Sequence, residues 1–203
     1  SIVDEAVEKG CNLIVSHHPL IFRPLKRVVG ADDVQRAVAK AIKHDITILS
    51  MHTNMDNAQG GVNFKMAEKM QLTGVKFFTE KQVDGITCGS GVMGELPGAM
   101  AADDFIMMLK REFDVECVQC NQLLRRPIRT VAICGGAGSF LLPEAIAAGA
   151  DAFVTGEMHY HDYFAHEQEI QIAVIGHYQS EQYTYEIFKS IIEEQCEGVR
   201  CVV

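Results

Sequence analysis

Short apolar runs alternate with helical patterns along much of this chain. Runs rich in β-forming residues cover 129–134, 152–155 and 172–175, and helical patterns cover 141–148, 161–169 and 182–194. Two further apolar runs, at 12–16 and 46–50, flank a helical pattern that starts at Ala31. Strands that alternate with helices at this spacing favour an α/β protein with a mostly parallel sheet. We therefore expect α/β/α layers.

The stretch 75–126 has a different pattern. It is rich in glycine and has short strand-like pieces, followed by a helical pattern over 101–112 and a possible strand over 115–120. We expect it to form a smaller α+β lobe with a mixed sheet. Residues 1–74 and 127–203 would then form the larger α/β domain. Because the chain opens inside an amphipathic helical pattern, the N-terminal part of that domain is expected to be missing.

Composition narrows the functional class. The chain has 203 residues, of which 48% are hydrophobic, so it can bury a sizeable core. Its 27 acidic residues outnumber its 18 Lys and Arg residues, which argues against direct binding of nucleic acid. No apolar run approaches the roughly 18 residues of a membrane span. The seven scattered cysteines favour reduced thiols and a cytoplasmic protein.

Imidazoles and carboxylates follow three of the expected strands. They are His17 and His18, then His52 and Asp56, and finally His177 and Glu181. Because ligands of open α/β sheets bind at the carboxyl ends of strands, these side chains are expected at one edge. His177 and Glu181 are four residues apart, which places both on one face of a helix.

The donor types favour a catalytic metal site. Imidazole and carboxylate without thiolate suit Zn, Mn, Fe, Co or Ni. The number of donors exceeds what one open catalytic ion needs, so two ions about 3.5 to 4 Å apart are plausible. An isolated His-His pair is about as often one core histidine beside one solvated histidine as it is part of a metal site. Three sets at one sheet edge favour the metal interpretation.

A glycine-rich segment, residues 135–139, lies between an expected strand and an expected helix. Its backbone amides could hold a phosphate, but it lacks the spacing of a P-loop or of a dinucleotide motif. A tight turn that requires glycine is the favoured interpretation.

Four motifs together resemble one known family. They are Ser16–Phe22, His52–Asp56 with Gly61–Asn63, Thr155–Asp162 and Gly176–Glu181. In this order they look like the NIF three-like family, whose members are also labelled dinuclear metal centre protein or GTP cyclohydrolase 1 type 2 homolog. The resemblance extends over nearly the whole chain.

The resemblance implies a two-lobed α/β fold, a ring-shaped homohexamer and two divalent metal ions per subunit. The metal ligands that it implies are His17, His18, Asp56, His177 and Glu181. Glu181 would bridge the two ions. His52 and His161 would lie near them.

Two functions remain open. The first is a dinuclear metal-dependent hydrolase in which His52 or His161 moves protons. Its small-molecule substrate would be GTP or a related purine nucleotide, as the family label suggests, with water added to the imidazole part of the base to open the ring. The alternative is a non-enzymatic metal-binding regulatory protein or a scaffold for protein interactions. Saturable turnover of GTP by the purified protein would separate the two.

Overall fold

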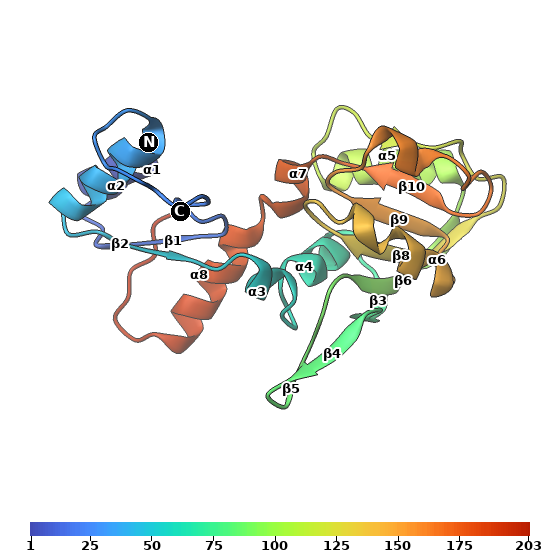
Figure 1. The fold of residues 1–203 in the computed structure, drawn as a ribbon. Coiled ribbons are helices and arrows are strands. Elements are labelled where there is room, and N and C mark those ends of the chain that lie inside the picture. The colour runs from blue at the N-terminus through green and yellow to red at the C-terminus, as the bar shows by residue number, and fades with distance from the viewer. The chain divides into compact units, whose positions relative to one another are not determined.

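The computed structural model describes residues 1–203, which form two compact units (Figure 1). The N-terminal unit comprises residues 1–55 together with 202–203, and the C-terminal unit comprises residues 56–201. The chain passes from the first unit to the second within one short helix, α3 (Thr53–Asp56).

The N-terminal unit is built on a two-stranded parallel sheet. β1 (Leu13–Ser16) pairs with β2 (Thr47–Ser50), and Ser16 lies opposite Ser50 at their carboxyl ends. Because parallel strands need a crossover connection, the chain between them forms a helix, α2 (Asp33–Lys43). The side chain of Asp32 caps this helix by accepting the backbone N–H of Gln35 at 2.8 Å.

A first helix completes this unit. The N-cap of α1 (Ile2–Glu8) is Ser1, whose side chain forms a capping box with Asp4. The two helices and the sheet enclose a small core of buried side chains, Val3, Ala6, Ala41 and Ile46. At the surface, Asp4 forms an ion pair with Lys40 and so links α1 to α2.

The C-terminal unit is organised around a six-stranded mixed sheet with the order β3-β6-β8-β9-β10-β7. The central strands β8 (Ile128–Cys134), β9 (Ala152–Thr155) and β10 (Gln171–Val174) are parallel to one another. The flanking strands are antiparallel to their neighbours: β3 (Thr73–Phe77), β6 (Val92–Met100) and β7 (Gln119–Cys120).

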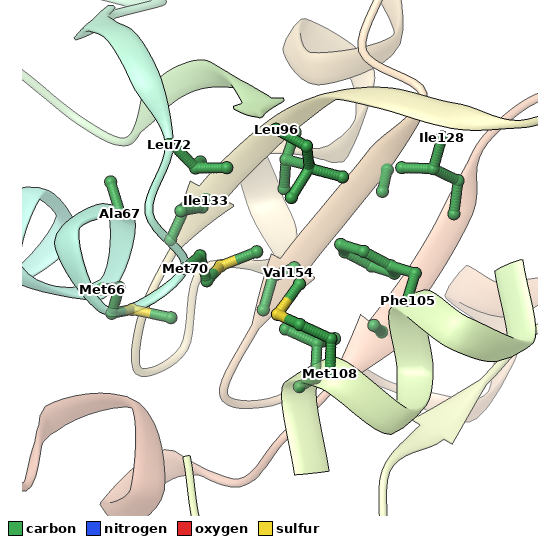
Figure 2. Close-up of a cluster of buried hydrophobic side chains, with 14 of the residues drawn as sticks. Met66, Ala67, Met70, Leu72, Leu96, Phe105, Met108, Ile128, Ile133 and Val154 are labelled. Atoms are coloured by element: carbon green, nitrogen blue, oxygen red, sulfur yellow. The ribbon is translucent and has the colours of Figure 1, made fainter. Parts of the chain in front are cut away.

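The side chains of alternate residues in the central strands point to opposite faces of the sheet, where they pack in two separate apolar layers. On one face, Val131, Ile133 and Val154 pack with α4 (Val62–Lys69) and α5 (Ala102–Glu112), as Figure 2 shows in part. On the other face, Ala132 and Phe153 pack with α6 (Leu142–Ala147) and the short helix η1 (Ser139–Leu141). The unit is therefore an α/β/α sandwich.

The remaining elements lie outside this sandwich. β4 (Glu80–Val83) and β5 (Ile86–Gly89) form a separate antiparallel hairpin. The chain after β10 forms α7 (His177–Glu181) and α8 (Thr184–Gln195). None of the helices has the length and apolar character needed to cross a membrane.

The predicted α/β class is confirmed, with parallel pairing among β8, β9 and β10 and antiparallel pairing in the strands of the middle segment. The predicted lobes were residues 75–126, and residues 1–74 together with 127–203. The boundary between the two compact units lies instead between residues 55 and 56. The reason is pairing between distant segments, because β3 and β6 join the sheet beside β8 and β7 joins it beside β10.

The helix predicted over 161–169 is wrong. The structure has only a short 3-10 helix, η2 (Tyr160–Tyr163), followed by turns in which Ala165 and Gln168 have positive φ. Gln168 accepts the backbone N–H of Arg125 at 2.9 Å and donates to the carbonyl of Leu123 at 3.0 Å. These contacts with a distant loop outweigh the local helical pattern.

Candidate metal centre

Three imidazoles converge at the carboxyl end of the sheet in the N-terminal unit. His17 and His18 follow β1 directly, and His52 follows β2 after one intervening residue. The ring centroids are 4.9 Å apart for His17 and His18, 5.2 Å for His17 and His52, and 4.8 Å for His18 and His52. One ring nitrogen of each lies within 4.8 Å of the other two, which is close enough to share an ion.

Parallel pairing explains this convergence. Because Ser16 and Ser50 are register partners, the residues after them leave the sheet side by side. Their hydroxyl oxygens are hydrogen bonded at 2.9 Å, and the backbone N–H of Met51 donates to the carbonyl of Ser16. The two strand ends are therefore fixed to each other at the point where the histidines begin.

The tautomer of His17 follows from its hydrogen bond. Nδ1 lies 3.0 Å from the carbonyl oxygen of Met51, which can only accept a hydrogen bond. Nδ1 therefore carries the hydrogen, and Nε2 carries the lone pair. A backbone carbonyl that fixes an imidazole in this way is a common second partner of metal-binding histidines.

The C-terminal unit holds a second set of donors, Asp56, His177 and Glu181. His177 and Glu181 begin and end α7, so the helical spacing brings Nε2 of His177 to 3.2 Å from Oε2 of Glu181. A carboxylate oxygen of Asp56 lies within 4.8 Å of one of Glu181. The set thus combines one imidazole with two carboxylates.

Glu157 is a site residue that the sequence prediction missed. Its Oε1 lies 2.6 Å from Nδ1 of His177, so this carboxylate accepts the Nδ1 hydrogen and directs Nε2 toward Glu181. Its position two residues beyond β9 was the available signal, because the predicted ligands also follow strand ends.

Buried hydrogen bonds hold the elements of this second set together. The Ser180 hydroxyl accepts the N–H of Gly136 at 2.9 Å and donates to the carbonyl of His177 at 2.7 Å. Asn63 accepts the N–H of Gly135 at 2.8 Å and donates to the carbonyl of Asp56 at 3.1 Å. The loop after β8 is therefore tied both to α7 and to the end of α3.

Two glycines allow this close approach. A Cβ on Gly136, whose φ is +60°, would overlap Oε1 of Glu181. A Cβ on Gly156 would lie 2.6 Å from the carbonyl oxygen of Gly136 and 2.9 Å from Cα of His177. The tight-turn interpretation of the glycine-rich segment 135–139 agrees with this crowding.

Cys134 lies in a buried region that is made negative by the nearby carboxylates of Asp56 and Glu181. Burial, together with these carboxylates, raises the pKa of its thiol to about 12. The thiol is therefore neutral at physiological pH. The donors in this region are imidazole and carboxylate, as the sequence predicted.

His161 is placed differently from the other predicted residues. It lies in η2, its side chain is 79% exposed, and Nε2 is 3.4 Å from Oδ1 of Asp162. Its ring stacks on that of His159 with centroids 5.6 Å apart. The structure groups it with these neighbours and not with the second donor set. Its predicted catalytic role stays a prediction.

Both donor sets fit divalent ions. In each set a histidine donates its Nδ1 hydrogen to an oxygen, which leaves Nε2 as the donor atom. Nε2 of His177 faces a carboxylate oxygen, so a cation or a second proton is needed between them. Imidazole and carboxylate ligands with fixed orientation are what Zn and similar ions require.

The class defined by this structure is an α/β protein that carries candidate metal-binding groups of imidazoles and carboxylates. A family model described as Duf34/NIF3 (NGG1p interacting factor 3) matches residues 1–203. The chain belongs to this family, and the predicted resemblance is confirmed.

Curated relatives carry a common name. A Streptococcus pneumoniae protein named GTP cyclohydrolase 1 type 2 homolog is 34% identical over 163 residues, which cover 78% of this chain and 60% of that protein. A Clostridium perfringens protein of the same name is 32% identical over 183 residues, covering 89% of this chain and 69% of that protein. The chain thus spans less than two thirds of the Streptococcus relative.

Solved structures share the fold. A hypothetical protein from Staphylococcus aureus has a TM-score of 0.84 at 26% identity, over 99% of this chain and 83% of that one. A Bacillus cereus protein described as related to NIF3 has a TM-score of 0.82 at 22% identity, over 100% of this chain and 86% of that one.

Proposed function

We propose that the protein is a hydrolase that depends on two divalent metal ions per subunit. The observation that carries this proposal is the pair of donor sets, each with an imidazole oriented by an oxygen acceptor. The proposed ligands are His17, His18, Asp56, His177 and Glu181, with Glu181 as the bridge. Zn, Mn, Fe, Co and Ni all suit these donors.

Bound divalent ions would polarise the substrate and lower the pKa of a water molecule toward neutrality. The chain itself must then orient the ligands and move protons. Met51 and Glu157 hold the two imidazoles in the tautomer that presents Nε2. The orientation of these two imidazoles is therefore set before an ion binds.

His52 is the proposed proton carrier. It is the third imidazole of the N-terminal set and is not among the proposed ligands, and its ring centroid lies 4.8 Å from that of His18. An imidazole in this position can accept a proton from the attacking water and return it to the leaving group. His161 is the second candidate for this role, because its exposed ring has Nε2 3.4 Å from Oδ1 of Asp162.

The proposed substrate is GTP or a related purine nucleotide, opened by addition of water to the imidazole part of the base. The names of the curated relatives support this substrate class. Measurable turnover would therefore be sought first with GTP in the presence of Mn or Zn.

Metal content tests the proposal directly. Elemental mass spectrometry should find about two ions per chain in the wild type and almost none in a His18→Ala, Glu181→Ala double variant. His166 and Glu169 form a similar pair, 2.9 Å apart, outside both donor sets. A His166→Ala, Glu169→Ala variant should therefore keep its metal. Equal metal content in the two double variants would overturn the assignment.

Turnover separates the hydrolase from the alternative. Glu181→Ala should abolish both metal binding and GTP hydrolysis, and activity that survives with empty sites would contradict the mechanism. The alternative is a non-enzymatic metal-binding scaffold, which the phrase "interacting factor" in the family description favours. Metal binding without turnover of GTP or other phosphorylated compounds, together with capture of a protein partner, would support it.

The remaining proposals concern assembly and location. The family resemblance supports a homo-oligomer, specifically a hexameric ring, which light scattering after size-exclusion chromatography would test. A cytoplasmic location is supported by the cysteines, all seven of which are free thiols in the structure. Fractionation of cells expressing the protein would test the location.

A further inference from the structure

A cavity of about 780 Å³ lies within the C-terminal unit, at the carboxyl ends of β8, β9 and β10. The loops that follow these strands form one side of it. The other lining comes mainly from residues 114–117, which follow α5, and from Gln119 of β7. Its volume is in the range of pockets that hold small molecules, and its place at strand ends is typical of ligand sites in α/β folds.

The lining of this cavity carries charge of one sign. Its charged residues are the carboxylates Asp114, Glu116 and Glu157, and neither Lys nor Arg is among the lining residues. The uncharged part includes apolar side chains, such as Val115, Met158 and Ile175, and amides. The one basic side chain in the lining is His159, whose Nδ1 lies 3.4 Å from Oδ2 of Asp162, so the cavity offers mainly hydrogen-bond acceptors and apolar surface.

This chemistry selects one end of a nucleotide over the other. A phosphate carries negative charge and would be repelled by the three carboxylates. A flat nitrogen heterocycle can pack on the apolar side chains while its N–H groups donate to the carboxylates. A ring with an exocyclic amino group has more such donors than one without.

Glu157 connects the cavity to the proposed metal centre. It lines the cavity, and the same carboxylate accepts the Nδ1 hydrogen of His177. A ring bound in the cavity would therefore lie beside one of the proposed metal ligands.

We propose that this cavity binds the base of a purine nucleotide through the N–H donors of an amino-substituted ring, and that the phosphates lie outside it. The inference rests on the proposed function, since it assigns the substrate's base to a defined place in the same site.

Cys117 offers a direct probe, because it is exposed and lines the cavity. The rate of its alkylation would be followed by peptide mass spectrometry on the full chain, as purified and again after chelation of metal. Cys196 is also exposed and is not among the lining residues, so it serves as the internal control. Saturating guanosine should slow alkylation of Cys117 about tenfold, leave Cys196 unchanged, and act in both preparations.

Two comparisons define the chemistry. Inosine, which lacks the 2-amino group, should need about tenfold higher concentration than guanosine for the same protection, the usual effect of one lost hydrogen bond to a charged group. Inorganic phosphate should give no protection. Glu116→Gln should weaken protection by guanosine about tenfold, whereas Glu80→Gln, on the exposed hairpin strand β4, should not.

Several results would overturn the inference: protection by phosphate at least equal to that by guanosine, protection that disappears on chelation, or equal protection in the Glu116→Gln and wild-type proteins. Circular dichroism would establish that both variants are folded. Failure of the metal proposal would appear separately, as absent metal or absent turnover in the protein as purified.

Discussion

The two units support their metal donors in different ways. In the N-terminal unit, three imidazoles follow the strands of a two-stranded sheet whose core has only four buried side chains. In the C-terminal unit, one imidazole and two carboxylates lie on the short helices α3 and α7, beside a six-stranded sheet with apolar layers on both faces. The candidate donors of the smaller unit are imidazoles, which are neutral as ligands, and both candidate carboxylates belong to the larger unit.

This difference teaches what each donor type requires of a fold. Neutral imidazoles can be positioned by two adjacent strand ends and one carbonyl acceptor, which a small unit can supply. Carboxylates held near each other repel, so the surrounding backbone must keep them in place. In the C-terminal unit, Gly136 and Gly156 allow the backbone to approach closely. The hydroxyl of Ser180 holds this backbone by accepting the N–H of Gly136.

The largest expected effect concerns core packing. Phe105 is fully buried in the C-terminal unit, so Phe105→Ala should lower the free energy of unfolding by about 3–5 kcal/mol. Ile46→Ala, in the small core of the N-terminal unit, should cost about 2 kcal/mol, because a site near the surface can collapse around the lost volume. Chemical denaturation measures the losses, and hydrogen exchange assigns each to its unit. Equal losses would show that the two cores are equally well packed.

Next in size is the effect of crowding at Gly136. Gly136→Ala should displace the carboxylate of Glu181 and lower metal affinity about a hundredfold, as loss of a supporting contact can do. Calorimetric titration with Zn would measure it.

Gly149 provides the matched control. Its φ is +77°, and a Cβ there would meet nothing within 4 Å. Gly149→Ala should therefore cost about 1 kcal/mol of stability for the strained backbone, as Gly136→Ala also does, without changing metal affinity. A similar loss of affinity in both variants would mean that backbone strain, and not the contact with Glu181, is responsible.

A smaller effect is expected at Glu157. Glu157→Gln replaces the charged acceptor of the His177 Nδ1 hydrogen and should weaken metal binding about tenfold. Glu169→Gln changes the same kind of pair, with His166 and outside both donor sets, and should leave affinity unchanged. If Glu157→Gln bound Zn like the wild type, the orientation of His177 would have to come from the backbone of α7 alone.

The smallest effect is on the pH dependence of stability. Burial alone would raise the pKa of Asp151, but backbone N–H groups of Thr130 and Arg129 and the guanidinium of Arg126 outweigh it and lower the pKa. A lowered pKa in the folded state stabilises the protein above the unfolded-state value of about 3.9. This stability is lost as the pH falls through the folded-state pKa.

Asp151→Asn should therefore cost about 1 kcal/mol at neutral pH, and the difference from the wild type should shrink in acid. Asp4, in the N-terminal unit, also has a lowered pKa, chiefly through its hydrogen bond with Lys40, but it is exposed. Asp4→Asn should have a smaller effect, and one that salt removes. Urea unfolding at several pH values and salt concentrations would rank the two. A larger loss of stability in Asp4→Asn than in Asp151→Asn would show that the exposed ion pair of the N-terminal unit contributes more than the partly buried carboxylate of the C-terminal unit.

Much of the fold and of the donor sets could be predicted from sequence because local patterns determine them. Apolar runs predicted the strands β8, β9 and β10. The separation of four residues between His177 and Glu181 predicted that both lie on one face of a helix. Parallel pairing then brought His17, His18 and His52 together without further information.

What could not be predicted depends on distant partners. The acceptor role of Glu157 needs His177, twenty residues further along the chain, to turn its Nδ1 toward it. The helix expected over 161–169 gave way to turns because Gln168 bonds to Leu123 and Arg125. The limits of the units depend on which edge of the sheet β3, β6 and β7 join, and periodicity carries no information about that choice.

The passage of the chain through α3 has a consequence for metal uptake. His52 and Asp56 belong to different units but are only four residues apart, so their Cα atoms can never be separated by more than about 14 Å. Such a short connection corresponds to an effective concentration of at least the order of millimolar for one donor near the other. Under the proposed function, an ion held near His52 would therefore meet Asp56 as a ligand of the same chain. Lengthening this connection would weaken retention of metal without altering any donor.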